Sequence, residues 1–266
     1  MSRRSCHWIA FGLGAALLWL MSALPAAAQI TTGFWWSAAE PGRGYVIEVA
    51  GSRAMLAVLG YRSGGTSAWY LSSGLLFTSS VFNNDLAELG GGQTLSGSAK
   101  APTSSTSLGN VVFSATSSSA ASVILPGGRE LAIQRYEFVS GGIAAGRSAA
   151  TPETGWWWNA AQPGRGFFID VQGRRLFLAA MMYESDGTSR WYTATGELIF
   201  GPFGLNPTMT ASLEEYGGGP TLSGAYTTPA RRSVKGQVTL TFASTTAAVL
   251  TLPNGTSVAL ARFTGF

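Results

Sequence analysis

Cysteine and histidine are almost absent from the chain, because the only residue of each type, Cys6 and His7, lies close to the N-terminus. From residue 8 onward there is no thiol and no imidazole, so the sequence excludes disulfides within that part of the chain and the usual zinc-ligand sets. It also excludes Ser-His and Cys-His pairs, and with them a triad hydrolase. The remaining chemistry is that of carboxylate, tyrosine, arginine and lysine side chains.

Charge is also sparse, since only 11% of the residues are charged. Two of the 17 Lys and Arg residues belong to the N-terminal leader described below, and the other 15 face 13 acids, which leaves a net charge of about +2. The basic residues are scattered apart from the pairs Arg174-Arg175 and Arg231-Arg232, whereas nucleic-acid binding needs a clustered basic face. We therefore expect no nucleic-acid partner.

The N-terminal residues have the pattern of a signal peptide. Two arginines precede the almost uninterrupted apolar run Trp8–Leu24, and Pro25 then leads into three alanines that end at Ala28. The alternative is a retained membrane anchor, because the run is nearly long enough to span a bilayer. The proline and the alanine triplet favour cleavage. We predict that residues 1–28 are a signal peptide and that the mature protein is periplasmic or secreted, with no membrane span.

The chain after the leader is an internal duplication. Gly33 to Tyr61 matches Gly155 to Tyr183 at a constant offset, and each copy contains Trp-Trp followed by Pro-Gly-Arg-Gly. Further along, Thr-Leu-Ser-Gly at residues 94–97 recurs at residues 221–224. The small and polar residues 140–154 are typical of a linker. We predict a first repeat unit over residues 29–139, a linker over 140–154 and a second unit over 155–266.

Each unit is predicted to consist of β-strands. Apolar runs such as Ala54–Tyr61 and Leu176–Tyr183 alternate with turn signals such as Asp186-Gly187 and Asn254-Gly255. No stretch after the leader combines helical periodicity with caps. About seven to nine strands per unit suit an up-and-down barrel or a sandwich. The expected fold class is all-β, with two tandem antiparallel β-barrel-like or sandwich-like units.

The repeated motif resembles that of uncharacterised exported proteobacterial β-repeat proteins, in which Gly-x-Trp-Trp-Asn-Pro-x-Glu-x-Gly-x-Gly is followed by Trp-Tyr. The first copy keeps Glu40 but has Ser37 in place of Asn, and the second keeps Asn159 but has Gln162 in place of Glu. A weaker resemblance to avidin and lipocalin barrels covers only the opening hairpins. The family resemblance implies export and a β repeat, and it implies no activity.

Tryptophan is concentrated in the two repeated motifs. All seven tryptophans after the leader lie there: Trp35, Trp36, Trp69, Trp156, Trp157, Trp158 and Trp191. Consecutive strand residues point to opposite faces, so we expect one of each adjacent pair to fill a barrel and the other to pack elsewhere. Clustered aromatic rings suit a surface that binds sugars or other rings. The alternative is a core residue plus an interface residue.

Glu48 and Asp170 occupy equivalent strand positions, opposite in alternation to their apolar neighbours. We expect both to face solvent. The alternative is a place inside a barrel, with Arg43 or Arg165, or Arg135 or Arg262, as the partner. The second copy has more polar groups near its motif and is the favoured binding copy. The candidate ligand-binding residues are Trp157, Trp158, Asn159, Arg165, Asp170, Tyr183, Arg190, Trp191 and Tyr192 in the second copy, and Trp36, Arg43, Glu48, Tyr61 and Trp69 in the first.

Three functions fit this inventory. The leading hypothesis is an exported, non-enzymatic binding protein that uses Trp, Arg and carboxylate side chains to hold a small ring-containing ligand or an envelope glycan. The second is a structural or interaction protein of the cell envelope, with its Trp faces buried between the units. The third is a carboxylate-dependent, glycan-active enzyme, with Glu48, Asp170 and Glu184 as available acids. No catalytic residue, metal or cofactor is predicted. The sequence is compatible with a homo-oligomer.

Overall fold

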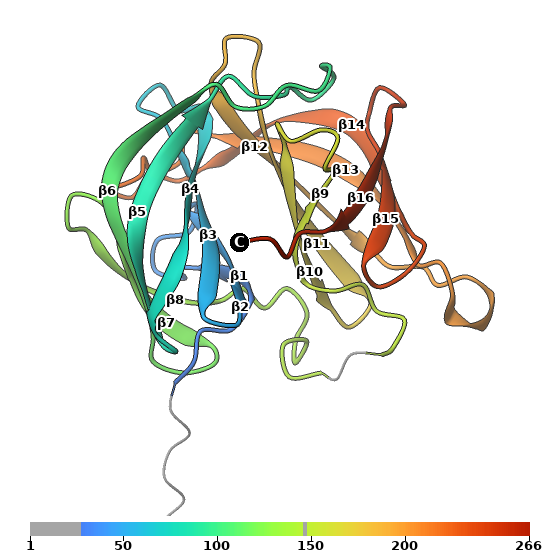
Figure 1. The fold of residues 1–266 in the computed structure, drawn as a ribbon, viewed down its shortest axis with the longest axis horizontal. Helices are drawn as coiled ribbons and strands as arrows, with labels where there is room; N and C mark the ends of the chain where they lie inside the picture. The colour runs from blue at the N-terminus through green and yellow to red at the C-terminus, as the bar shows by residue number, and fades with distance from the viewer. Residues whose placement is uncertain (1–27, 146–147) are drawn as a thin grey trace, which may run out of the picture.

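The protein folds into two closed antiparallel β-barrels of eight strands each. The computed structural model describes residues 28–145 and 148–266, so the predicted signal peptide lies outside the described residues except for Ala28. The expected all-β fold with two tandem units is confirmed, and each unit is a barrel and not a sandwich. Figure 1 shows the barrels beside one another, with the first in blue to green and the second in yellow to red. Among the described residues, no helix is long and apolar enough to cross a membrane.

The strands follow one another around each barrel in chain order. The first barrel contains β1 (Gly33–Trp36), β2 (Gly44–Ala50), β3 (Arg53–Tyr61), β4 (Ser67–Thr78), β5 (Val81–Gly90), β6 (Ser104–Ala115), β7 (Ala120–Ile124) and β8 (Glu130–Arg135). The second contains β9 (Gly155–Trp158), β10 (Gly166–Gln172), β11 (Arg175–Tyr183), β12 (Ser189–Glu197), β13 (Thr208–Gly217), β14 (Ala230–Phe242), β15 (Ala247–Thr251) and β16 (Ser257–Arg262). A 3₁₀ helix, η1 (Pro202–Gly204), lies in the insertion of the second copy.

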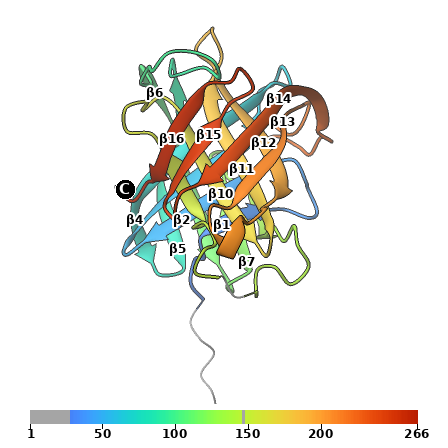
Figure 2. The ribbon, with the colours of Figure 1, turned by 90° about the vertical axis from the view of Figure 1, so that its right-hand side faces the viewer.

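Each barrel closes where its first strand pairs with its last. Trp35 of β1 lies opposite Arg135 of β8, and Trp157 of β9 lies opposite Arg262 of β16. Figure 2 shows the strands of the second barrel crossing its wall obliquely, as closure of a sheet into a barrel requires. A closed barrel leaves no edge strand exposed, which suits a fold that has no disulfide.

Alternation along the strands fills the two barrel interiors. In β8, for example, Leu131 and Ile133 are buried while their neighbours Ala132 and Gln134 are exposed. Trp35 is fully buried in the first barrel, and its ring meets the Phe113 ring edge to face at 5.2 Å. Trp157 does the same in the second barrel, where its centroid is 5.6 Å from that of Phe242. The prediction that one tryptophan of each pair fills a barrel is therefore confirmed.

The strands that face the other barrel are buried on both sides. Almost every residue of β3 and β11 is buried, and β2 and β10 show the same pattern. Their outward side chains, such as Val46, Leu59, Phe168 and Met181, form a third apolar cluster between the two barrel cores together with Phe34 of β1. A strand that is buried on both faces reads as a continuous apolar run, and this explains Ala54–Tyr61 and Leu176–Tyr183.

The repeated Thr-Leu-Ser-Gly segments cross from one barrel to the other. After β5, the backbone N–H of Gln93 donates to Gly164 at 3.1 Å, and Gln93 accepts from the N–H of Tyr183 at 3.1 Å. Leu95 then packs against the core of the second barrel. The segment after β13 does the reverse, since Leu222 packs against the core of the first barrel. Each barrel therefore completes its core with a residue of the other.

Candidate functional site

Three of the tryptophans are buried between the barrels. The Nε1 of Trp69 donates to the carbonyl of Met182 and the Nε1 of Trp191 to the carbonyl of Gly60, each at 2.9 Å. The Nε1 of Trp156 donates to a carbonyl of β3 at 3.2 Å. Every one of these hydrogen bonds joins one barrel to the other. The three indoles therefore supply both apolar area and directed contacts to the interface.

Trp36 and Trp158, the outward members of the two pairs, are only partly buried. The Trp158 ring meets that of Phe263 at 4.9 Å, and the Trp36 ring meets that of Tyr136 at 5.4 Å. Each lies beside a pocket at the junction of the two barrels. These are the tryptophan rings that a ligand reaches without displacing a barrel core.

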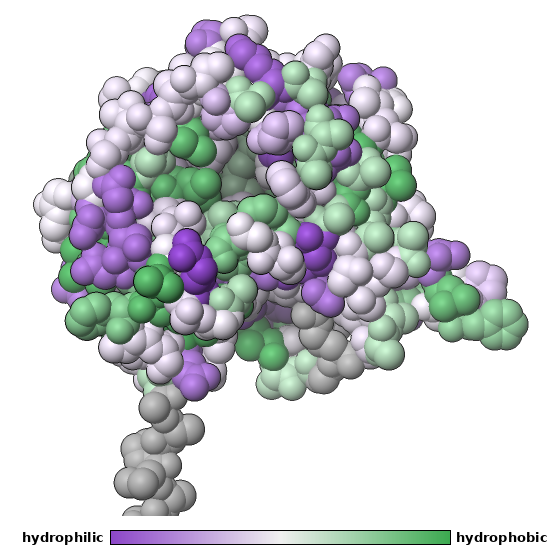
Figure 3. Space-filling model, viewed as in Figure 1, coloured by the Kyte–Doolittle hydropathy of each residue, from purple (hydrophilic) through white to green (hydrophobic). Residues whose placement is uncertain are grey.

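The pocket beside Trp158, here called the Arg165 pocket, has a volume of about 240 Å³. It is lined by Met55, Trp69, Leu71, Leu89, Pro102, Trp156, Trp157, Trp158, Pro163, Gly164, Arg165, Gly166, Met181, Tyr183 and Phe263. Figure 3 shows a hollow between the barrels on this face, with hydrophobic residues on much of its wall. Apolar and aromatic side chains with few polar groups are typical of a small-molecule site.

Gly166 leaves room on one wall of the Arg165 pocket. A Cβ built on Gly166 would meet no atom within 4 Å. At the equivalent Gly44 of the first copy, a Cβ would lie 2.5 Å from the ring of Phe34. The second copy has Trp156 in place of Phe34, and its indole extends to a carbonyl of β3. The pocket is therefore open at a place that an aromatic ring covers in the first copy.

The other pocket, here called the Arg43 pocket, is related to the first by the internal duplication and also has a volume of about 240 Å³. Its lining is Phe34, Trp36, Gly42, Arg43, Gly44, Leu59, Tyr61, Tyr136, Phe177, Trp191, Thr193, Tyr216 and Pro229. The Tyr216 ring stacks on that of Trp191 at 6.2 Å. Hydroxyl-bearing residues in this pocket, such as Thr193 and Tyr216, correspond to leucines in the Arg165 pocket. The Arg165 pocket is therefore the more apolar of the two.

Glu48 and Asp170 do not face solvent, so that expectation was wrong. Glu48 is 6% exposed and Asp170 is 1% exposed, because their strand faces are covered by the opposite barrel. The Glu48 carboxylate pairs with Arg262 and accepts a hydrogen bond from the backbone N–H of Trp156 at 2.5 Å. The Asp170 carboxylate pairs with Arg135 at 3.0 Å. The expected arginines are the partners, but each comes from the barrel that does not contain the acid.

These two ion pairs lie apart from the aromatic pockets. Glu48, Asp170 and Arg135 line a polar cavity of about 250 Å³, and none of the three lines the Arg165 pocket or the Arg43 pocket. A buried acid that is paired with arginine and a backbone N–H has its hydrogen-bonding capacity committed to the fold. Both acids thus hold the barrels together in this structure.

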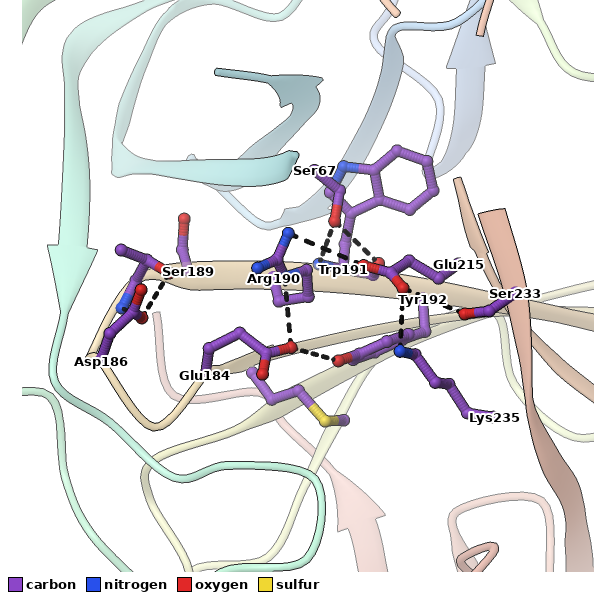
Figure 4. Close-up of polar contacts among 12 residues, drawn as sticks. Ser67, Glu184, Asp186, Ser189, Arg190, Trp191, Tyr192, Glu215, Ser233 and Lys235 are labelled. Atoms are coloured by element: carbon purple, nitrogen blue, oxygen red, sulfur yellow. Dashed lines mark hydrogen bonds and ion pairs between the residues drawn. The ribbon is translucent and has the colours of Figure 1, made fainter. Parts of the chain in front are cut away.

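Arg190 and Tyr192, which were predicted as site residues, belong to a charged network beside the mouth of the second barrel (Figure 4). The Nε of Arg190 lies 3.2 Å from Glu184, and the Tyr192 hydroxyl donates to the same carboxylate at 2.8 Å. Arg190 also lies 3.7 Å from Glu215, which pairs with Lys235 at 2.9 Å. Burial, together with the hydrogen bond to Glu184, raises the pKa of Tyr192. The two acidic residues, Glu184 and Glu215, and the two basic residues, Arg190 and Lys235, give this network no net formal charge.

Glu215 and Lys235 were not predicted, because no motif marks them and they lie on β13 and β14, far along the chain from Arg190. Three members of the network, Glu184, Tyr192 and Lys235, line a cavity of about 280 Å³ whose lining also includes Leu95. In the first copy, an Arg62–Glu88 pair occupies the equivalent region. The second copy thus has more charged side chains in this region than the first, as the sequence indicated. Their formal charges cancel, and the network is separate from the Arg165 pocket.

The other predicted site residues have varied places. Asn159 lies in a turn, where its Oδ1 accepts from the backbone N–H of Ala161 at 2.8 Å. Tyr61 and Tyr183 are almost fully buried, and burial raises the pKa of each phenol. The hydroxyl of Tyr183 is buried without a hydrogen-bond partner. Of the fourteen predicted residues, the Arg165 pocket brings together Trp69, Trp157, Trp158, Arg165 and Tyr183, and the Arg43 pocket brings together Trp36, Arg43, Tyr61 and Trp191.

Within the described residues, no group of three or more His, Cys, Asp or Glu side chains is placed to hold a metal ion. Comparison with known proteins finds no relative, since no protein-family model, no curated protein and no solved structure matches the chain. The function is therefore argued from the pockets themselves.

Proposed function

We propose that this protein is an exported, non-enzymatic binding protein that holds one small ring-containing molecule in the Arg165 pocket. The observation that carries the proposal is the partly buried Trp158 at a pocket whose other walls include Trp69 and Trp156. Three indoles around one small volume offer stacking and edge contacts to a flat ring. The pocket is formed by residues of both barrels, so a ligand held there would depend on both copies.

A flat, largely apolar ring suits this lining better than a glycan does. A sugar carries hydroxyl groups along its rim, and each one that loses water without a new partner costs free energy. The polar side-chain groups in the lining are the indole N–H groups, the guanidinium of Arg165 and the hydroxyl of Tyr183. The Nε1 atoms of Trp69 and Trp156 already donate to carbonyls. An envelope glycan is thus the less favoured ligand.

The proposal can be tested with the chain from Gln29 onward and a neutral probe, 2-naphthalenemethanol. Isothermal calorimetry and tryptophan emission should both report saturable binding with one site per chain. In Gly166→Leu the new side chain projects into the open wall of the pocket, and affinity should fall by about tenfold or more. Gly64→Leu is the matched control, because Gly64 is exposed and a Cβ there also meets nothing within 4 Å.

Two results would contradict the proposal. One is the absence of saturable binding for any ring compound, together with a normal unfolding transition. The other is equal binding by the wild-type protein and Gly166→Leu, which would place the ligand elsewhere. Saturable binding of envelope oligosaccharides, with none of ring compounds, would replace the ligand class.

A structural or interaction protein of the envelope is the second candidate function. The burial of Trp69, Trp156 and Trp191 between the barrels favours it, because these residues have a sufficient role in joining the two units. It makes the opposite prediction for ligand binding: Trp158 emission should not respond to any small molecule. A carboxylate-dependent enzyme has less support, since Glu48 and Asp170 are engaged in buried pairs with arginine.

A further inference from the structure

The two copies of Pro-Gly-Arg-Gly place their arginines in equivalent positions, but only one arginine has a carboxylate partner. Arg43 is buried, and its Nη1 lies 3.3 Å from Glu40. Its Nε donates to the carbonyl of Thr221 at 2.9 Å. Glu40 also pairs with Arg129 at 2.6 Å. The guanidinium of the first copy is therefore held by a carboxylate and by the crossing segment.

The second copy has no residue that corresponds in charge to Glu40 or to Arg129. Gln162 stands where the first copy has Glu40, and Thr256 stands where it has Arg129. Arg165 donates from Nη1 to the carbonyl of Leu95 at 3.1 Å and from Nη2 to the side-chain oxygen of Gln162. Both acceptors are neutral. Among the described residues, no Asp, Glu or C-terminal carboxylate lies within 4.0 Å of this guanidinium.

A buried guanidinium without a counter-charge is costly, because a charge taken out of water normally needs an ionic partner. Arg165 is 6% exposed, and its Nε is buried without a hydrogen-bond partner. Burial lowers the pKa of Arg165, and no neighbouring acid offsets the effect. A guanidinium nevertheless stays charged in proteins. An anion brought to this residue would supply the missing charge and accept hydrogen bonds in the planar geometry that carboxylates share with arginine.

Arg165 is the one formally charged residue among those that line the Arg165 pocket. In the same lining, the Tyr183 hydroxyl is a second buried polar group without a partner. Both observations concern the same small volume, whose remaining lining is mostly apolar or aromatic. A neutral hydrocarbon would leave the positive charge uncompensated there.

The geometry points to an aromatic carboxylate as the ligand class of the Arg165 pocket, with the ring against the indoles of Trp69, Trp156 and Trp158 and the carboxylate on the guanidinium of Arg165. This inference rests on the proposed function and narrows it. The Arg43 pocket does not share the preference, because Glu40 and the carbonyls of Thr221 and Gly224 already accept from all three nitrogens of its guanidinium. One chain therefore contains a pocket whose arginine has no acidic partner and a counterpart whose arginine is paired with Glu40.

The test compares two probes of nearly equal shape, 2-naphthoate and 2-naphthalenemethanol, by calorimetry at pH 7 with the chain from Gln29 onward. The carboxylate should bind about tenfold or more tightly than the alcohol, in line with a charge-assisted hydrogen bond. Gln162→Glu restores the acid of the first copy beside Arg165 and should abolish the preference while leaving the affinity for the alcohol unchanged. Arg165→Gln should abolish the preference as well.

Gln237→Glu is the matched control, since it adds the same charge at an exposed position of β14 and should leave the preference intact. Urea unfolding of Gln162→Glu shows whether the fold is kept, which the stable arrangement of the first copy leads us to expect. Equal affinity for naphthoate and the alcohol would overturn this inference and leave the proposed function standing. A preference that survives in Gln162→Glu would also overturn it. Binding of neither probe would contradict the proposed function itself.

Discussion

The Asp170 carboxylate of the second barrel accepts a hydrogen bond from the backbone N–H of Phe34 in the first, at 3.1 Å. The duplication repeats this contact in reverse, between the Glu48 carboxylate and the N–H of Trp156. Each acid therefore accepts a hydrogen bond from the first strand of the opposite barrel. It also pairs with the arginine at the end of that opposite barrel's last strand. The two copies of the motif therefore hold the barrels together through reciprocal contacts.

Asp170→Asn should destabilise the whole protein by about 3–5 kcal/mol, because it leaves Arg135 buried without its partner. The substitution keeps the shape of the side chain, so the loss reports the charge and not a cavity. Urea unfolding followed by far-UV circular dichroism measures it. Asp85→Asn, at an exposed position, should stay within about 0.5 kcal/mol of wild type. Equal stability of Asp170→Asn and Asp85→Asn would mean that the Asp170–Arg135 ion pair contributes nothing to the free energy of unfolding.

The two barrels should unfold together in one transition. Leu95 and Leu222 each complete the core of the opposite barrel, so neither barrel keeps its core when the other opens. Leu95→Ala should cost about 2 kcal/mol, near the lower end for a leucine truncation because the residue is only partly buried. Scanning calorimetry should show a single peak in wild type and in the variant. Two resolved peaks, with only one moved by Leu95→Ala, would contradict this account.

Trp191 and Trp158 should respond differently to replacement by Phe. Trp191→Phe removes the buried hydrogen bond to the carbonyl of Gly60 and shrinks a buried ring, and the two losses together should cost about 1–3 kcal/mol. Trp158→Phe removes no such bond and should change stability by less than about 1 kcal/mol. Urea midpoints of the two variants give the comparison. A loss that is as large for Trp158 as for Trp191 would assign Trp158 to the structural core.

Glu40 should make stability depend on pH in the acid range. The hydrogen bond from Arg129, with the positive charges of Arg129 and Arg43, holds the pKa of Glu40 below its ordinary value of 4.5. Because the folded-state pKa is the lower one, this contribution is complete above about pH 4.5 and is lost as the pH falls through the folded value. Urea midpoints between pH 7 and 3 should therefore fall less steeply in Glu40→Gln than in wild type.

Glu130→Gln is the control for that series, because Glu130 is exposed and has no ion pair among the described residues. Its pH profile should follow that of wild type. If the profile of Glu40→Gln also ran parallel to wild type, the ion pairs of Glu40 would have no effect on folding.

Much of the fold could be predicted from local patterns. Alternation such as that of Leu131 and Ile133, with turn signals between runs, indicates β-strands, and the constant offset between copies indicates two equal units. The apolar runs Ala54–Tyr61 and Leu176–Tyr183 contain a further signal. A strand that is apolar on both faces must be covered on both faces, which predicts that the barrels pack against each other.

The contacts between the barrels could not be predicted, because they join residues far apart in the chain. Glu48 pairs with Arg262, 214 positions away. The sequence left two places for each acid, solvent or the inside of a barrel, and the structure shows a third, the interface between the two barrels. The lack of a carboxylate partner for Arg165 could be predicted, since a comparison of the copies shows Glu40 replaced by Gln162. Its importance depends on burial, which only the structure provides.

The most direct test of ligand binding between the barrels is a ¹H–¹⁵N spectrum of the indole N–H groups, recorded with and without 2-naphthoate. The chain from Gln29 onward has seven tryptophans, so seven indole signals can be assigned by single Trp→Phe variants. We predict that naphthoate shifts the signals of Trp69, Trp156 and Trp158 and leaves that of Trp35 in place. Seven unchanged signals at saturating ligand, or changes confined to Trp36 and Trp191, would contradict the assignment of the site to the Arg165 pocket.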